Sequence, residues 1–174
     1  MNAEFTSPAL TASSKKLEGA FREWDRLSDF VAEKPLETES AAMRWSAVTT
    51  IASALHNIYN GLEDVMKTLC KSVDSFVPTG SSSHQDILDQ MSSPRKDVRP
   101  ALVGEDWYAD MNELRAFRNL ISHNYRRELR GDLVIENLKR METILPLFLA
   151  AMHDLDRHLS EPNGDDPVPG PYDR

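Results

Sequence analysis

Residues 41–76, AAMRWSAVTTIASALHNIYNGLEDVMKTLCKSVDSF, decide the fold class. Apolar residues recur there every three or four positions, with charged residues on the opposite face, and this period predicts one long helix with an apolar seam. Thr38 or Ser40 can cap the start of this helix, and Pro78–Gly80 ends it. The seam consists of Trp45, Val48, Ile51, Ala52, Leu55, Ile58, Tyr59, Leu62, Val65, Met66, Leu69, Val73 and Phe76.

The same apolar period predicts four further helices. One covers residues 11–34 and ends at a proline, and a short one covers about 84–91. Another runs over 105–125 or slightly beyond. The last begins near Asp132, a plausible cap, and contains Pro146, which predicts a kink because proline removes a backbone hydrogen bond.

These elements predict an all-α fold, an antiparallel bundle of four main helices plus one short helix, because no run alternates as a strand would. We expect a flexible N-terminus over 1–10 and the helical bundle over 11–160. Residues 161–174 are rich in proline and acidic residues, so we expect a disordered tail.

Bulk composition narrows the functional class. The chain has 174 residues, enough for one domain, and its net charge of −8 argues against a general nucleic-acid coat protein. Cys70 is the single cysteine, which excludes an intrachain disulfide and favours a reducing compartment. No apolar run is long enough to span a membrane and no secretory signal is recognised, so we expect a cytoplasmic protein without a membrane partner.

The candidate site lies in residues 117–125, FRNLISHNY. Arg118 falls on the apolar stripe of its helix, where a charge is costly unless it is paired or used. His123 carries the side chain whose ordinary pKa suits proton transfer near neutral pH. An anion stabiliser beside a proton carrier can cleave a phosphodiester, but a buried pair of Arg118 with a carboxylate of the second or fifth helix explains the arginine equally well.

Helical geometry limits how Arg118 and His123 can cooperate. Five residues apart, they lie about 140° apart on a straight helix. A regular helix therefore does not direct both side chains to one point. Either the helix ends or bends near Ser122, or a second subunit completes the site.

The sequence Arg118–Tyr125 resembles the motif of the HEPN superfamily, an arginine followed after four residues by a histidine. With Asn119 and Tyr125 in register, it resembles more narrowly the HepT-like toxins. Residues 51–63, and the turn 78–80 leading to 84–88, are similar to the same positions of that family, and the resemblance covers roughly residues 45–160.

This resemblance implies a metal-independent endoribonuclease that acts as a homodimer, with two copies of the motif in one composite cleft. In that site His123 takes or gives the proton at the ribose 2′-oxygen or the leaving 5′-oxygen, and Arg118 holds the scissile phosphate of the RNA. Asn119 orients His123 or the phosphate, and Ser122 is a weaker candidate for a phosphate hydrogen bond.

The family further implies a partner, a minimal nucleotidyltransferase (MNT-type) that acts as antitoxin by adding AMP to Tyr125. The alternative for Tyr125 is a core aromatic residue at the end of its helix. A basic patch surrounds the motif and is typical of an RNA-contact surface, although cations at a helix C-terminus have the same pattern. The patch comprises Arg115, Arg118, Arg126, Arg127 and Arg130.

Other residues carry weaker signals. We expect no cofactor and no DNA partner. We also expect no metal site, because the spacing of His153 and His158 does not place both on one helical face. His84 could line the cleft, but a surface position is favoured. The alternatives to a nuclease are a non-catalytic HEPN dimerisation or partner-binding module and a purely structural helical bundle.

Overall fold

The computed structural model describes residues 4–123 and 129–161, and for His123 only the backbone. Throughout these ranges the regular elements are helices, with one isolated bridge between Arg95 and Arg99. This confirms the all-α prediction. The elements are a 3-10 helix (Pro8–Leu10), α1 (Thr11–Ala32), α2 (Ala41–Ser72), α3 (Ser83–Ser92), α4 (Glu105–His123) and α5 (Gly131–Ser160).

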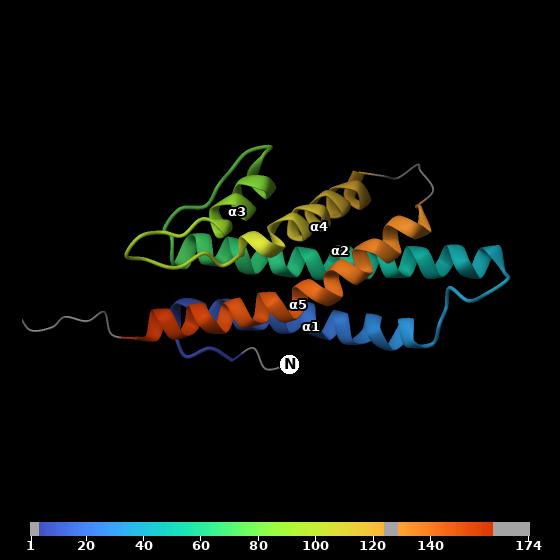
Figure 1. Ribbon diagram of the computed structural model, residues 1–174, viewed down its shortest axis with the longest axis horizontal. Coiled ribbons are helices and arrows are strands. Elements are labelled where there is room, and N and C mark those ends of the chain that lie inside the picture. The colour runs from blue at the N-terminus through green and yellow to red at the C-terminus, as the bar shows by residue number, and fades with distance from the viewer. Residues whose placement is uncertain (1–3, 124–128, 162–174) are drawn as a thin grey trace, which may run out of the picture.

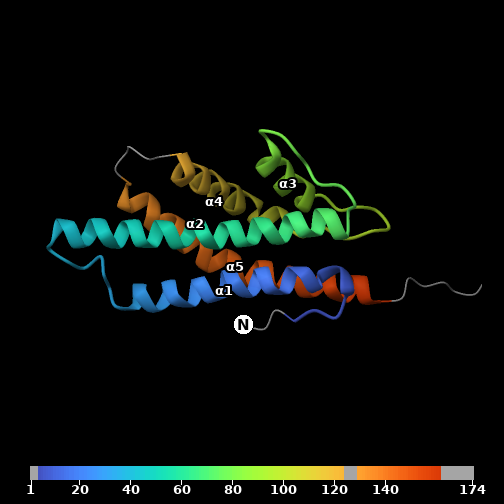
Figure 2. The same ribbon diagram turned by 180° about the vertical axis from the view of Figure 1, so that it is seen from behind.

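Helix α2 is the centre of the bundle (Figure 1). It packs against α1, α3, α4 and α5, which explains why its apolar seam is buried along most of its length. Figures 1 and 2 show α1 running antiparallel beside α2, with α4 and α5 crossing it and α3 lying against its C-terminal half. The predicted four main helices and one short helix are therefore present.

A glycine lets α1 and α2 approach closely. A Cβ atom placed on Gly61 of α2 would lie 3.0 Å from the Cβ atom of Ala20 on α1, which is tighter than ordinary contacts. Both positions are small, so the helix backbones can pack together where larger side chains would separate them.

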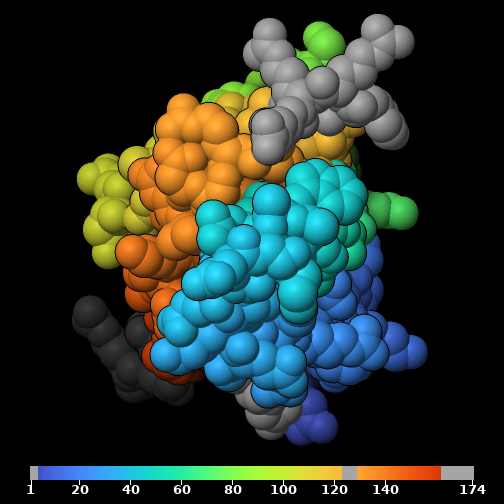
Figure 3. All heavy atoms as spheres, turned by 90° about the vertical axis from the view of Figure 1, so that its right-hand side faces the viewer, coloured from blue at the N-terminus to red at the C-terminus, as the bar shows by residue number. Residues whose placement is uncertain are grey.

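Both ends of α2 differ from the predicted seam. Ser40 caps the helix as expected, since its hydroxyl accepts a hydrogen bond from the Met43 backbone N–H. The first turns of α2 project beyond the end of α1 in Figures 1 and 2, on the side that faces the viewer in Figure 3. Trp45, which belongs to these turns, is 63% exposed. At the other end α2 stops at Ser72, so Phe76 is exposed as well.

A buried ion pair holds the connection after α2. The Asp74 carboxylate accepts two hydrogen bonds of 2.8 Å from the Nε and Nη2 groups of Arg99, and both side chains are 0% exposed. Arg99 also donates to the backbone carbonyls of Ser93, Pro100 and Gln90. The loop after α3 is therefore fastened to the segment that follows α2.

The N-terminal segment, the two features of α5 and the tail have separate outcomes. The described part of the N-terminal segment packs on the bundle, because the Asp156 carboxylate accepts hydrogen bonds from the backbone N–H groups of Thr6 and Ser7. Asp132 does not cap α5; it lies in the first turn, after Gly131. Pro146 lies inside α5, whose axis changes direction along its length in Figure 1. Of the predicted tail, residues 162–174 are outside the described ranges.

Candidate functional site

Arg118 lies one turn beyond the buried face of α4. Trp107, Met111 and Leu114 on that face are buried, and Phe117 joins them in the core. Arg118 continues this stripe but is only half-buried, and its guanidinium reaches α2 and α3 instead of the core. The charge therefore stays at the edge of the bundle while its aliphatic stem is covered.

The partners of the Arg118 guanidinium are side chains without a formal negative charge. Its Nε donates to Asn60 Oδ1 at 2.7 Å, and its Nη1 donates to Asn119 Oδ1 at 3.1 Å. Nη1 also lies 3.4 Å from Nε2 of His84. Within the described part of the chain, no carboxylate lies within ion-pair distance of Arg118. The alternative interpretation, in which Arg118 pairs with a carboxylate of the second or fifth helix, is therefore wrong for the described residues. The arginine is oriented but its charge is not neutralised.

A buried carboxylate holds His84 in place. Glu63 of α2 is 1% exposed, and its Oε2 lies 2.8 Å from Nδ1 of His84. The other carboxylate oxygen accepts from the Lys67 ammonium group. Because a guanidinium can only donate, the 3.4 Å contact is a hydrogen bond only when Nε2 of His84 accepts from Arg118, and Nδ1–H then donates to Glu63.

Tyr59 lies one turn before Glu63 and faces the same cluster. Burial raises the pKa of its phenol, the Glu63 carboxylate raises it further, and the Arg115 and Arg118 guanidinium groups oppose the shift. The hydroxyl makes no hydrogen bond to the described residues. Tyr59 is therefore a buried, neutral phenol close to the Arg115 and Arg118 guanidinium groups.

The structure assigns contacts to the predicted supporting residues. Asn119 orients Arg118. Ser122 donates its hydroxyl hydrogen to the Arg118 backbone carbonyl at 3.0 Å, a common arrangement within helices. Arg115 is half-buried on the same helix, and its Nε donates to Asn112 at 3.1 Å.

The remaining predicted residues lie around the end of α4. The helix ends at His123, whose side chain is outside the described set, as are Tyr125, Arg126 and Arg127 entirely. Arg130 is exposed and forms an ion pair with Asp132. Of the predicted basic patch, the structure therefore brings Arg115 and Arg118 onto one helix and shows Arg130 paired with a carboxylate.

Sequence reasoning missed three residues of the cluster: Asn60, Glu63 and His84. Asn60 and Glu63 are three positions apart among the apolar residues of α2, so they share a face of the helix. A glutamate at a buried position of a helical seam is itself a signal, because an isolated buried carboxylate is costly. His84 was favoured as a surface residue, but α3 places it between Glu63 and Arg118.

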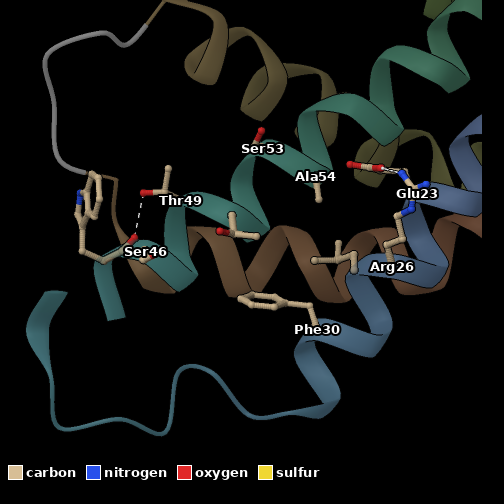
Figure 4. A pocket seen from close by; sticks show the side chains of 10 residues that line it. Glu23, Arg26, Phe30, Ser46, Thr49, Ser53 and Ala54 are labelled. Carbon is tan, nitrogen blue, oxygen red and sulfur yellow. Dashed lines mark hydrogen bonds and ion pairs between the residues drawn. The ribbon is translucent and has the colours of Figure 1, made fainter. Parts of the chain in front are cut away.

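A hollow with a volume of about 570 Å³ lies elsewhere, between α1 and the start of α2 (Figure 4). Its lining contains none of the predicted site residues. Glu23 and Arg26 are its charged members, and they pair with each other at 3.6 Å. Hydroxyl and apolar side chains make up the rest, so the carboxylate of Glu23, which is paired with Arg26, is the acid–base group of this lining.

Two searches of the described residues bear on other site types. Residues 4–123 and 129–161 contain no group of three or more His, Cys, Asp or Glu side chains placed to hold a metal ion. Within the same ranges, no helix combines the length and apolar character needed to cross a membrane.

The fold and the site define an all-helical HEPN-like bundle with an arginine-centred polar cluster between its second, third and fourth helices. A family model described as HepT-like protein matches residues 50–159, more than half of the chain, so the chain belongs to the HepT-like family. No curated protein and no solved structure matches it significantly.

Proposed function

We propose that this protein is a metal-independent endoribonuclease that works as a homodimer through Arg118 and His123. One observation supports this most strongly: Arg118 is held by Asn60, Asn119 and His84, so among the described residues its positive charge is oriented without a neutralising carboxylate. A preorganised, half-buried guanidinium is suited to bind a phosphate and to stabilise charge that develops on it.

The chemistry follows from two roles. His123 takes the proton of a ribose 2′-hydroxyl as its oxygen attacks phosphorus, or gives a proton to the departing 5′-oxygen. Arg118 holds the phosphate between these oxygens. Because a dimer supplies two copies of His123, one can serve as base and the other as acid. Asn119 then acts by orienting Arg118, and Ser122 by closing the last turn of α4.

We also propose that the nuclease is the toxin of a toxin–antitoxin pair in the cytoplasm. Its antitoxin would be a nucleotidyltransferase that adds AMP to Tyr125. The added phosphate and nucleoside would place negative charge and bulk two residues after His123 and exclude the RNA backbone. Arg115, Arg126 and Arg127 would contact RNA, whereas the pairing of Arg130 with Asp132 weakens its candidacy.

A second candidate is a non-catalytic module whose motif surface serves dimerisation or partner binding. Leu120, between Asn119 and Ile121, is 38% exposed, and an apolar residue beside the motif favours a protein interface. An interface of this kind is equally required by a composite nuclease site. Activity therefore separates the two candidates.

The test is cleavage of total cellular RNA by the purified chain in EDTA. Wild-type protein should cleave RNA, and His123→Ala should lose at least about 100-fold in rate. His158→Ala, a change at an exposed histidine of α5, is the matched control and should cleave like the wild type. If the wild type carries no added mass and still does not cleave, the nuclease proposal is wrong; added mass of one AMP would identify a modified Tyr125.

A further inference from the structure

We propose that His84, held by Glu63, is a second phosphate-binding side chain beside Arg118 and takes up a proton on Nε2 when phosphate binds. The inference rests on the proposed function only in identifying the phosphate as that of RNA. The ligand chemistry is a phosphoryl anion, and the site is complete within one protomer.

The imidazole ring of His84 is held in one orientation. Glu63 Oε2 fixes Nδ1 at 2.8 Å, and this directs Nε2 to the edge of the Arg118 guanidinium, 3.4 Å from Nη1. A carboxylate that fixes one ring nitrogen leaves the other available for binding or proton transfer. Helices α2, α3 and α4 each supply one member of this chain, so the fold positions the ring.

The His84 side chain is accessible to a ligand from the solvent. The His84 side chain is 31% exposed, whereas Glu63 behind it is 1% exposed. A ligand that reaches Arg118 therefore meets the outer edge of His84 and not the carboxylate. A histidine that only satisfied the buried Glu63 would not need to contact the one arginine of the motif.

The charges around His84 change when a phosphate binds. His84 lies in a set of charged groups: Lys67 on α2 pairs with both Glu63 and Asp64, and Arg118 reaches the ring from α4. Tyr108 on α4 binds Asp89 on the next turn of α3. Without a ligand, this part of α2 and α4 therefore carries two carboxylates and two cations, and the ring lies 3.4 Å from Arg118. A bound phosphate adds negative charge and takes the guanidinium hydrogens, so an imidazolium between two anions becomes favourable.

The proton step is balanced by water. One proton from the solvent forms the Nε2–H bond, and this N–H donates to a phosphate oxygen. Nδ1 keeps its own hydrogen, which continues to donate to the Glu63 carboxylate. No bond of the phosphate breaks in this step. Glu63 acts through His84, so it is a positioning residue, and His84 touches the ligand.

The first experiment uses wild-type protein, expressed alone and labelled with ¹⁵N, with inorganic phosphate as the probe. At pH 7, added phosphate should move the ring nitrogens of His84 toward the imidazolium signals, and the His158 ring should not move. The assignment comes from the signals that disappear in His84→Gln. Phosphate that binds without moving the His84 signals, or phosphate that does not bind at all, overturns the proposal.

The second experiment measures phosphate binding by calorimetry in two buffers of different ionisation enthalpy. Wild type should take up protons on binding. His84→Gln should bind about tenfold more weakly, with that uptake lost, because one charge-assisted hydrogen bond is missing. Glu63→Gln should reduce proton uptake while retaining His84, and His158→Gln should match the wild type. Equal affinity and equal proton uptake in His84→Gln contradict the proposal.

Cleavage assays separate this inference from the proposed function. Phosphate binding with proton uptake in a chain that cleaves no RNA supports the site and rejects the nuclease. RNA cleavage by His84→Gln at the wild-type rate, together with unchanged phosphate binding, supports the nuclease and rejects the role of His84.

Discussion

Arg99 and Arg118 are both held by hydrogen bonds to other parts of the bundle, but by opposite kinds of partner. Arg99 is fully buried and binds the Asp74 carboxylate through two hydrogen bonds. Arg118 is half-buried and is held by two asparagines and a histidine. A neutralised, inaccessible guanidinium fastens a loop to the bundle, whereas a guanidinium that is oriented and has no carboxylate partner in the described part of the chain is available to an anion. Burial and partner chemistry thus distinguish a structural arginine from a binding arginine.

The largest expected effect on stability comes from breaking the Arg99 cluster. Arg99→Ala removes the buried cation that binds the Asp74 carboxylate and leaves it with Gln90 and the exposed Arg95, so it should lower the free energy of unfolding by about 3–5 kcal/mol. Arg22→Ala is the control, because Arg22 is exposed and its ion pair with Glu18 is 3.8 Å long. That change should cost less than about 1 kcal/mol. Urea unfolding of both variants measures this, and equal losses would remove the distinction.

Acid should weaken the same cluster. Burial alone would raise the pKa of Asp74, but hydrogen bonds from Arg99 and Gln90 outweigh it and hold the pKa below its ordinary value. The pair therefore stabilises the fold fully above the ordinary aspartate pKa of about 3.9, and this stability is lost as pH falls through the lower, folded-state value. Thermal unfolding from pH 6 to pH 2 should show a smaller acid-induced drop in Asp74→Asn than in wild type. Parallel curves would contradict this assignment.

The helices were predictable and the clusters were not. The apolar period of α2 is local, so it gives the helix directly, and it fails at Trp45 and Phe76 because exposure depends on where the neighbouring helices end. Arg118 and His123 stand out because the motif is contiguous. Asn60 and His84 are far from Arg118 in the chain, and only the packing of α2, α3 and α4 brings them together. The same reason hides the pair of Asp74 and Arg99.

The orientation of Arg118 can be loosened without removing its charge. Asn60→Ala deletes the 2.7 Å hydrogen bond to Nε and should lower RNA cleavage about tenfold, with little change in stability. Asn57→Ala is the matched control, since Asn57 is exposed one turn earlier on α2 and faces Glu23 of α1. A rate in Asn60→Ala equal to that of the control would show that this hydrogen bond does not position the arginine for catalysis.

The smallest expected effect concerns Ser122. Its hydroxyl is engaged with the Arg118 backbone carbonyl, so Ser122→Ala should change the free energy of unfolding by no more than about 0.5–1 kcal/mol and leave cleavage near the wild-type rate. Steady-state cleavage and thermal unfolding together check this. A loss of cleavage with unchanged stability would instead assign Ser122 to the phosphate.

Arg118→Ala, measured for RNA cleavage and for unfolding in the same preparation, tests the central claim most directly. Since its partners are neutral and half-exposed, the account predicts a loss of at least about 100-fold in cleavage with less than about 2 kcal/mol of lost stability. A loss of about 3–5 kcal/mol would place Arg118 with Arg99 among the structural arginines and contradict the account.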